Sequence, residues 1–130
     1  MTTNPDVIRL DYVADPRSLY EAADLFCFPS HFEGYGNVML EASAMGIPSV
    51  GFDVPGVQEA IAHDVSGRLS AFGDTQAMAD DIIDILGDET LYARLRSEGL
   101  ERIHSTFGQD AFFALLDTLF HDVMAESKKK

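Results

Sequence analysis

The chain has 130 residues and is 46% hydrophobic, which is enough for one globular domain with a real core. Its 22 Asp and Glu against 9 Lys and Arg give a formal net charge of −13, which argues against nucleic acid or an anionic membrane as a partner held by bulk charge. The first residues lack the basic start and apolar core of a signal peptide, and no apolar run reaches membrane-spanning length, so we expect a cytoplasmic protein.

The first predicted unit is a strand followed by a helix. Residues 7–13 alternate loosely between apolar and polar side chains, a pattern typical of a strand. Asp15-Pro16 follows and favours the start of a helix that contains Leu19 and Tyr20, because proline suits the first turn of a helix. These residues therefore predict a βα unit.

The second predicted strand is the short apolar and aromatic run over residues 24–30, which ends at Pro29-Ser30. Such a run is typical of an interior strand in a parallel sheet. Cys27 lies in this strand and is the only cysteine, so the sequence offers neither a disulfide framework nor a cysteine-based metal site. We expect Cys27 to be buried and therefore a poor nucleophile, since burial raises the pKa of a thiol.

The elements that follow alternate between helix and strand. We predict a helix over residues 37–45, a strand over 48–52, a short helix over 57–62 and a short strand over 66–71. With the earlier elements, this order predicts an α/β fold with a Rossmann-like parallel sheet of about four strands and flanking helices.

The C-terminal part is predicted to be helical. Asp74 can cap a first helix, residues 89–103 form a second, and residues 109–125 form a third. We therefore describe residues 1–130 as a single, partial domain, with βα units over 7–73, helices over 74–126 and a solvated tail over 127–130. The third helix has a wide apolar face, which predicts self-association through residues 109–125; the face comprises Phe112, Phe113, Leu115, Leu116, Leu119, Phe120, Val123 and Met124.

The loop between the second strand and its helix carries the candidate chemistry. A helix that starts near Asn37 presents unpaired backbone N–H groups, which suit a diphosphate, and Gly34 and Gly36 allow a ligand to approach the backbone closely. Glu41 lies on the same face as Asn37, about 6 Å further along the helix axis, where a carboxylate can accept hydrogen bonds from ribose hydroxyls. Glu33 lies before the helix, on the other side of the expected diphosphate position, where a group attached to the diphosphate would extend.

An ordered set of residues around this loop resembles a known family. The set comprises Glu33 and Glu41 in a Glu-x7-Glu pattern with Gly-x-Gly-Asn inside it, Pro29-Ser30, residues 44–48, Gly56 to Glu59, residues 66–69 and Gly73-Asp74. It resembles the C-terminal, nucleotide-sugar-binding domain of retaining, GT-B-fold glycosyltransferases of family 4, also called glycosyl transferases group 1. The resemblance spans most of the chain, from about Val7 onward, and implies a truncated domain.

The resemblance also implies roles for single residues. It implies that Glu33 is the catalytic residue that contacts the donor sugar and that Glu41 binds the ribose. It implies that the diphosphate lies on the loop and the helix start, at Gly34, Gly36, Asn37 and Val38. Three further residues match the family less closely and are weaker candidates for ligand contact: His31, Tyr35 and Glu59. No cofactor or metal is implied, and the remaining histidines, His63, His104 and His121, have no ligand-like spacing.

Four of these candidate residues can also have a role that involves no ligand. Each can be an ordinary surface or helix-start side chain; the four are His31, Glu33, Glu41 and Glu59. The resemblance favours ligand contact for Glu33 and Glu41, whereas the alternatives are an exposed loop position for His31 and a helix-start charge for Glu59. The glycine pair lacks the third glycine of a dinucleotide fingerprint, where Met39 stands, so an NAD-dependent oxidoreductase is disfavoured.

The sequence between Arg17 and Arg68 contains no Lys or Arg, so the predicted diphosphate site supplies no cation of its own. A helix terminus carries only about half a charge. We therefore expect the isolated chain to be inactive. The resemblance implies that the parent glycosyltransferase moves a hexose from a nucleoside diphosphate sugar to a glycan or lipid-linked acceptor, with the acceptor held by an N-terminal domain. The alternative is a non-catalytic binding or association module of the same fold.

Overall fold

Three parallel strands form the centre of the computed structural model, which describes residues 4–127 and, for residues 122–127, the backbone alone. The strands are β1 (Phe26–Phe28), β2 (Ser49–Phe52) and β3 (Gly67–Ser70), and they lie in the order β1-β2-β3. In this register Ser49 pairs with both Phe26 and Gly67. The parallel α/β fold is confirmed, but the described sheet has three strands rather than the predicted four.

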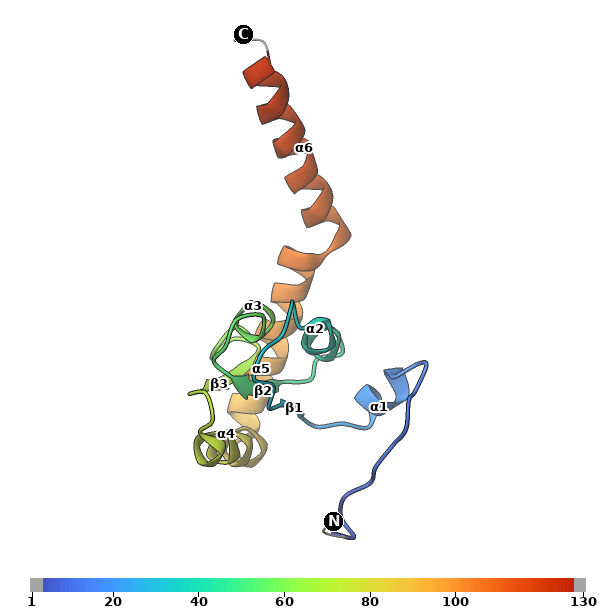
Figure 1. The fold of residues 1–130 in the computed structure, drawn as a ribbon, viewed down its shortest axis with the longest axis vertical. Coiled ribbons are helices and arrows are strands. Elements are labelled where there is room, and N and C mark those ends of the chain that lie inside the picture. Colours follow the sequence, from blue (N-terminus) through green and yellow to red (C-terminus); the bar gives the residue numbers. More distant parts are fainter. Residues whose placement is uncertain (1–3, 128–130) are drawn as a thin grey trace.

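The predicted strand over residues 7–13 is wrong. These residues have no strand pairing and lie in an extended segment away from the sheet (Figure 1). Two of their apolar side chains are almost fully exposed, Ile8 at 83% and Tyr12 at 92%. Alternating side chains make a segment compatible with a sheet, but a strand forms only where a neighbouring strand pairs with its backbone, and no described residue does so here.

Strand β1 lies at the edge of the described sheet and not in its interior as predicted, because β2 alone pairs with it. Cys27, predicted to be buried, is exposed at this edge. Its sulfur atom lies 3.7 Å from the sulfur atom of Met78. This side of the thiol is covered, and the partial burial raises the pKa of the thiol. The prediction failed because it assumed a strand on both sides of β1.

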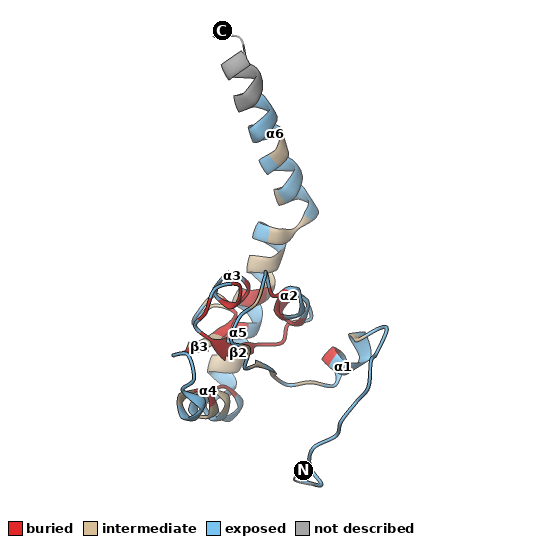
Figure 2. Ribbon diagram, in the orientation of Figure 1, coloured by how far each residue is buried: buried red, intermediate tan, exposed pale blue. Residues whose placement is uncertain are grey.

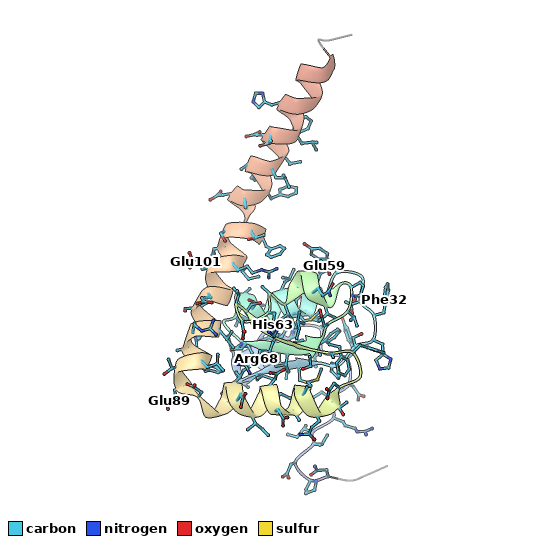
Figure 3. The ribbon with its side chains drawn as sticks, turned by 90° about the vertical axis from the view of Figure 1, so that its left-hand side faces the viewer. Phe32, Glu59, His63, Arg68, Glu89 and Glu101 are labelled. Carbon is cyan, nitrogen blue, oxygen red and sulfur yellow. The ribbon has the colours of Figure 1, made fainter. Side chains whose placement is uncertain are left out.

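Helices cover both faces of the sheet. Figures 1 and 3 show α2 (Asn37–Ala44) and α3 (Val57–Ala60) on one side of the strands and α4 (Thr75–Gly87) on the other. Helix α5 (Glu89–Arg102) packs against both α2 and α4. The buried residues concentrate between these layers (Figure 2); the main cluster comprises Met39, Val50, Phe52, Val54, Val57, Ala60, Ile61, Met78, Ile85 and Leu95. This packing holds α2, which carries most of the candidate site residues, against the sheet.

Aspartates fix the starts of the two long helices of the domain body. The carboxylate of Asp74 accepts a hydrogen bond from the backbone N–H of Ala77 at 2.9 Å, which confirms the predicted cap of α4. Asp88 accepts hydrogen bonds from the N–H groups of Thr90 and Leu91 at the start of α5. Each carboxylate thus satisfies helix N–H groups that have no partner within the helix.

The two ends of the described chain extend away from the sheet. Helix α1 (Arg17–Glu21) follows Asp15-Pro16 as predicted. At the other end, α5 continues through the π-helix η1 (Ile103–Phe107), and Gly108, with φ −67° and ψ 156°, interrupts the helix before α6 (Gln109–Ser127).

Helix α6 projects from the body of the molecule, and its described surface is mostly exposed (Figures 1 and 2). Its apolar side chains include Phe112, Leu119 and Phe120, which are 57%, 56% and 64% exposed. Within residues 4–127, no helix combines the length and the apolar content needed to cross a membrane.

Candidate functional site

The start of α2 is open toward the preceding loop. Gly36 precedes the helix with a φ of 71°, and among the described residues no side chain caps it. A β-carbon at position 36 would collide with the Met39 side chain and would lie 3.1 Å from the carbonyl oxygen of Gly56, so glycine is needed here. Asn37 and Val38, the first two residues of the helix, are exposed.

Gly56 packs against the loop that carries Glu33. Its φ is 83°, and a β-carbon at this position would collide with the carbonyl group of Glu33. The N–H of Gly56 donates to the carboxylate of Glu59 at 2.6 Å, which closes the start of α3. This contact supports a helix-start role for Glu59. In Figure 3, Glu59 and Phe32 lie on the opposite side of the domain body from Glu89.

A first pocket, of about 390 Å³, lies beside the loop, and we call it the Glu33 pocket. Its lining residues are Phe28, Glu33, Tyr35, Gly36, Asn37 and Val38. Five of the predicted site residues therefore come together here. Glu33 is half-buried, and its carboxylate accepts a hydrogen bond from the N–H of Gly34 at 3.0 Å.

His31 lies outside this lining. Its ring is exposed and meets the ring of Phe72 edge-on, with 5.0 Å between the ring centroids. The packing on Phe72 supports the interpretation of His31 as an exposed loop residue.

A second pocket, of about 350 Å³, contains Glu41, and we call it the Glu41 pocket. Its lining residues are Asp15, Pro16, Arg17, Tyr20, Glu41, Ala44 and Met45, so α1 and the loop before it form one wall and α2 the other. The hydroxyl of Tyr20 lies 3.0 Å from Oε2 of Glu41. Sequence reasoning missed the α1 wall, because no local pattern indicates that α1 packs beside a residue 21 positions later.

The two pockets lie end to end along one face of α2. The pocket-lining residues of α2, and Met45 directly after the helix, are all exposed; they are Asn37, Val38, Glu41, Ala44 and Met45. Met39, Ala42 and Ser43, on the other side of the helix, are buried. Spacings of three and four residues place the exposed side chains on the same face of a helix. With a rise of 1.5 Å per residue, Glu41 stands about 6 Å along the axis from Asn37.

Positive charge is sparse at these pockets. Among the described residues, none that lines the Glu33 pocket is Lys or Arg. Arg17 lines the Glu41 pocket, but its guanidinium binds the carboxylate of Asp15 at 2.6 Å. The hydrogen bonds between the two lower the pKa of Asp15 and raise the pKa of Arg17.

Arg102 approaches the site from α5 but is engaged in packing. It donates to the carbonyl oxygens of Glu59 and Ala60 at 2.6 and 2.9 Å, and its guanidinium lies 5.0 Å from the ring centroid of Phe107. Burial lowers the pKa of Arg102, and nearby Tyr35 opposes this shift. Sequence reasoning did not identify Arg102, which lies far from the loop in the chain.

No group of three or more His, Cys, Asp or Glu side chains in the described part of the chain is arranged to hold a metal ion.

Known proteins are similar to this chain in sequence and in fold. The sequence profile described as glycosyl transferases group 1 matches residues 2–88. The capsular polysaccharide biosynthesis glycosyltransferase CapM of Staphylococcus aureus is 31% identical over all of this chain, which spans 34% of that protein.

Two solved structures have a similar fold. Sucrose-phosphate synthase from Thermosynechococcus elongatus matches with a TM-score of 0.72 and 30% identity, over 85% of this chain and 28% of that one. HepE of Anabaena in complex with UDP-glucose matches with a TM-score of 0.70 and 28% identity, over 83% of this chain and 31% of that one. The chain thus spans about a third of the length of these proteins, and it belongs to the glycosyl transferases group 1 family.

Proposed function

We propose that this chain is the nucleotide-sugar-binding portion of a retaining glycosyltransferase. The observation that carries the proposal is the continuous exposed face of α2, which joins the Glu33 pocket to the Glu41 pocket. A ligand with a nucleoside at one end and a sugar at the other matches this layout. The similar protein HepE was solved with UDP-glucose, which has that form.

The proposed ligand lies along α2. Its nucleoside occupies the Glu41 pocket, where the ribose hydroxyls donate to the carboxylate of Glu41. Its diphosphate lies at the open helix start, where the N–H groups of Asn37 and Val38 and the backbone of Gly34 and Gly36 approach it. This arrangement places a helix N-terminus beside the negative charge that develops on the departing diphosphate.

The sugar of the proposed ligand occupies the Glu33 pocket. Glu33 is half-buried there, and Gly56 holds its backbone, so its carboxylate faces the sugar from a fixed loop. We assign Glu33 as the catalytic residue on this basis. Tyr35, which lines the same pocket, is a further contact, and His31 and Glu59 are weaker candidates because each already has a structural partner.

The whole protein is proposed to transfer a hexose to a glycan or a lipid-linked acceptor in the cytoplasm, with no metal required. Because the chain spans about a third of its relatives, we assign acceptor binding to parts of the longer protein outside these residues. The described Glu33 pocket offers no cation for the diphosphate. We therefore expect no sugar transfer by this chain alone.

Calorimetry tests the donor site. UDP, GDP and ADP are titrated into the chain, and at least one is expected to bind. Glu41→Ala should weaken binding about tenfold or more, because a hydrogen bond to a charged group contributes roughly 1.5–3 kcal/mol. The matched control is Glu101→Ala, since Glu101 is an exposed glutamate on α5 outside both pockets (Figure 3). Unchanged affinity in Glu41→Ala would remove the assignment of Glu41 to the ribose. In a separate activity assay, robust turnover of a UDP- or GDP-sugar by this chain would contradict the expected inactivity.

A second candidate function is a non-catalytic module that associates through α6. The exposed apolar side chains of this helix favour it, because an apolar helix face normally packs against another surface. We propose a second copy of the chain as the partner of α6 in solution.

A further inference from the structure

Tyr20 reaches Glu41 from a different helix. Its ring is buried, with 8% exposure, and packs in a small cluster with Ala42 and Ile47. Its hydroxyl group lies 3.0 Å from Oε2 of Glu41 and 3.3 Å from the carbonyl oxygen of Val38. The packing of the buried ring therefore fixes the position of the hydroxyl group, which contacts the exposed carboxylate of Glu41.

The hydroxyl group is a hydrogen-bond donor at this position. A phenol has one proton, and a carboxylate is a stronger acceptor than a backbone carbonyl group, so the proton goes to Glu41. Burial, together with the hydrogen bond and the charge of Glu41, raises the pKa of Tyr20 to about 12. The proton is thus retained over the whole physiological range.

The contact restricts a side chain that is otherwise mobile. Glu41 is exposed, and a glutamate loses rotamer entropy when a ligand fixes it. The bond to Tyr20 uses Oε2, while no described hydrogen bond engages Oε1. The carboxylate is therefore held at the wall of the Glu41 pocket with acceptor capacity left for a ligand.

We propose that Tyr20 is a positioning residue, which holds the Glu41 carboxylate ready for the ribose hydroxyls and so sets the preference for ribose over deoxyribose. This inference rests on the proposed function. Ordering Glu41 in advance lowers the cost of binding a ribose, and it gives no advantage to a sugar that lacks the donating hydroxyl.

The test compares UDP with 2′-deoxy-UDP and 3′-deoxy-UDP by calorimetry, or the GDP or ADP series where that base binds more tightly. The unchanged chain should bind the ribose form at least tenfold more tightly than one of the deoxy forms. Tyr20→Phe should reduce this preference about three- to tenfold and leave the affinity for that deoxy form unchanged. The matched control is Tyr92→Phe, since Tyr92 is a half-buried tyrosine on α5 outside the Glu41 pocket.

A double variant separates positioning from general packing. In a Glu41→Gln background, Tyr20→Phe should have no further effect on the preference, because its action passes through the carboxylate. An equal loss in that background shows a role independent of Glu41 and overturns the inference. If Tyr20→Phe melts too low to be assayed, NMR of 13C-labelled tyrosine follows the unchanged chain instead, with Tyr20 recognised by its raised pKa. A larger shift of the Tyr20 signal with the ribose form than with the deoxy form supports the inference, and equal shifts overturn it.

The outcomes for the two proposals are distinct. If the unchanged chain binds UDP without preferring ribose, nucleotide binding by the chain stands, while the ribose contact of Glu41 and the role of Tyr20 are both contradicted. If the chain binds none of UDP, GDP and ADP, the proposed function and the positioning role of Tyr20 are both contradicted.

Discussion

The carbonyl group of Glu33 lies against the α-carbon of Gly56, in the space that a β-carbon would occupy. The loop that carries Glu33 is therefore packed on the turn before α3. The position of the proposed catalytic carboxylate depends on a residue that touches no ligand in the proposed arrangement.

Gly56→Ala should destabilise the chain more than Gly73→Ala does. Both glycines have a positive φ, 83° and 81°, so both variants carry a strain of about 1–2 kcal/mol. A β-carbon at Gly73 meets no atom within 4 Å, whereas at Gly56 it collides with Glu33, which adds roughly 1–3 kcal/mol. Urea denaturation measures both free energies of unfolding, and equal losses would show that the loop moves aside without cost.

Tyr20 should titrate about two pH units above an ordinary tyrosine. Its folded pKa of about 12 exceeds the usual value near 10, so its contribution to stability is complete below pH 10 and is lost as the pH rises toward 12. Glu41→Gln should lower this pKa, although burial keeps it above 10. NMR of 13C-labelled tyrosine follows the phenol, with Tyr20→Phe to assign its signal, and an ordinary pKa for Tyr20 would contradict the observed packing.

Helix α6 should mediate self-association. Leu119 is 56% exposed, and burying this side chain against a second copy contributes about 1.5–3 kcal/mol. Light scattering over a concentration series should show association that Leu119→Ser weakens. Thr118→Ser is the control, since the Thr118 hydroxyl donates to the Ala114 carbonyl oxygen of its own helix and serine can keep that bond. A strictly monomeric mass at high concentration would count against the second copy as partner.

Arg68→Met should destabilise the chain in a salt-dependent way. Arg68 lies within 3.1 to 3.3 Å of carboxylate oxygens of Asp64, Asp81 and Asp84, and its side chain is only 23% exposed. Its removal leaves three carboxylates close together, which should cost about 2 kcal/mol, and added salt should recover part of this loss. Arg17→Met breaks an exposed pair with Asp15 that solvent screens, so it should destabilise the chain far less than Arg68→Met does. A loss at Arg68 that is insensitive to salt would indicate packing and not charge.

The sequence predicts the elements that are specified locally. The helix start at Asn37, the cap at Asp74 and the three described strands follow from glycine and proline positions, cap residues and short apolar runs, and each of these elements is confirmed. The same local rules fail for residues 7–13 and for Cys27, because strand formation and burial there depend on a neighbouring strand. A pattern of side chains indicates compatibility with a sheet but does not supply a partner.

Parts of the site depend on contacts between distant residues. The face shared by Asn37 and Glu41 follows from helix periodicity, so their arrangement could be predicted. The approach of Tyr20 to Glu41 and that of Arg102 to Glu59 join different helices, and no spacing in the sequence specifies them. The ligand roles of Glu33 and Glu41 remain predictions for the binding experiments.

Helix α2 also fixes the distance between the two ends of the proposed ligand site. Its backbone is rigid and hydrogen-bonded, so the separation between the open helix start and Glu41 cannot adapt to the molecule that binds. A group held by Glu41 and an anion held by the helix start must therefore be separated by a fixed length. In the proposed arrangement, the helix therefore selects ligands by the distance between their two ends, and one inserted residue between Asn37 and Glu41 would rotate Glu41 by about 100° away from its pocket.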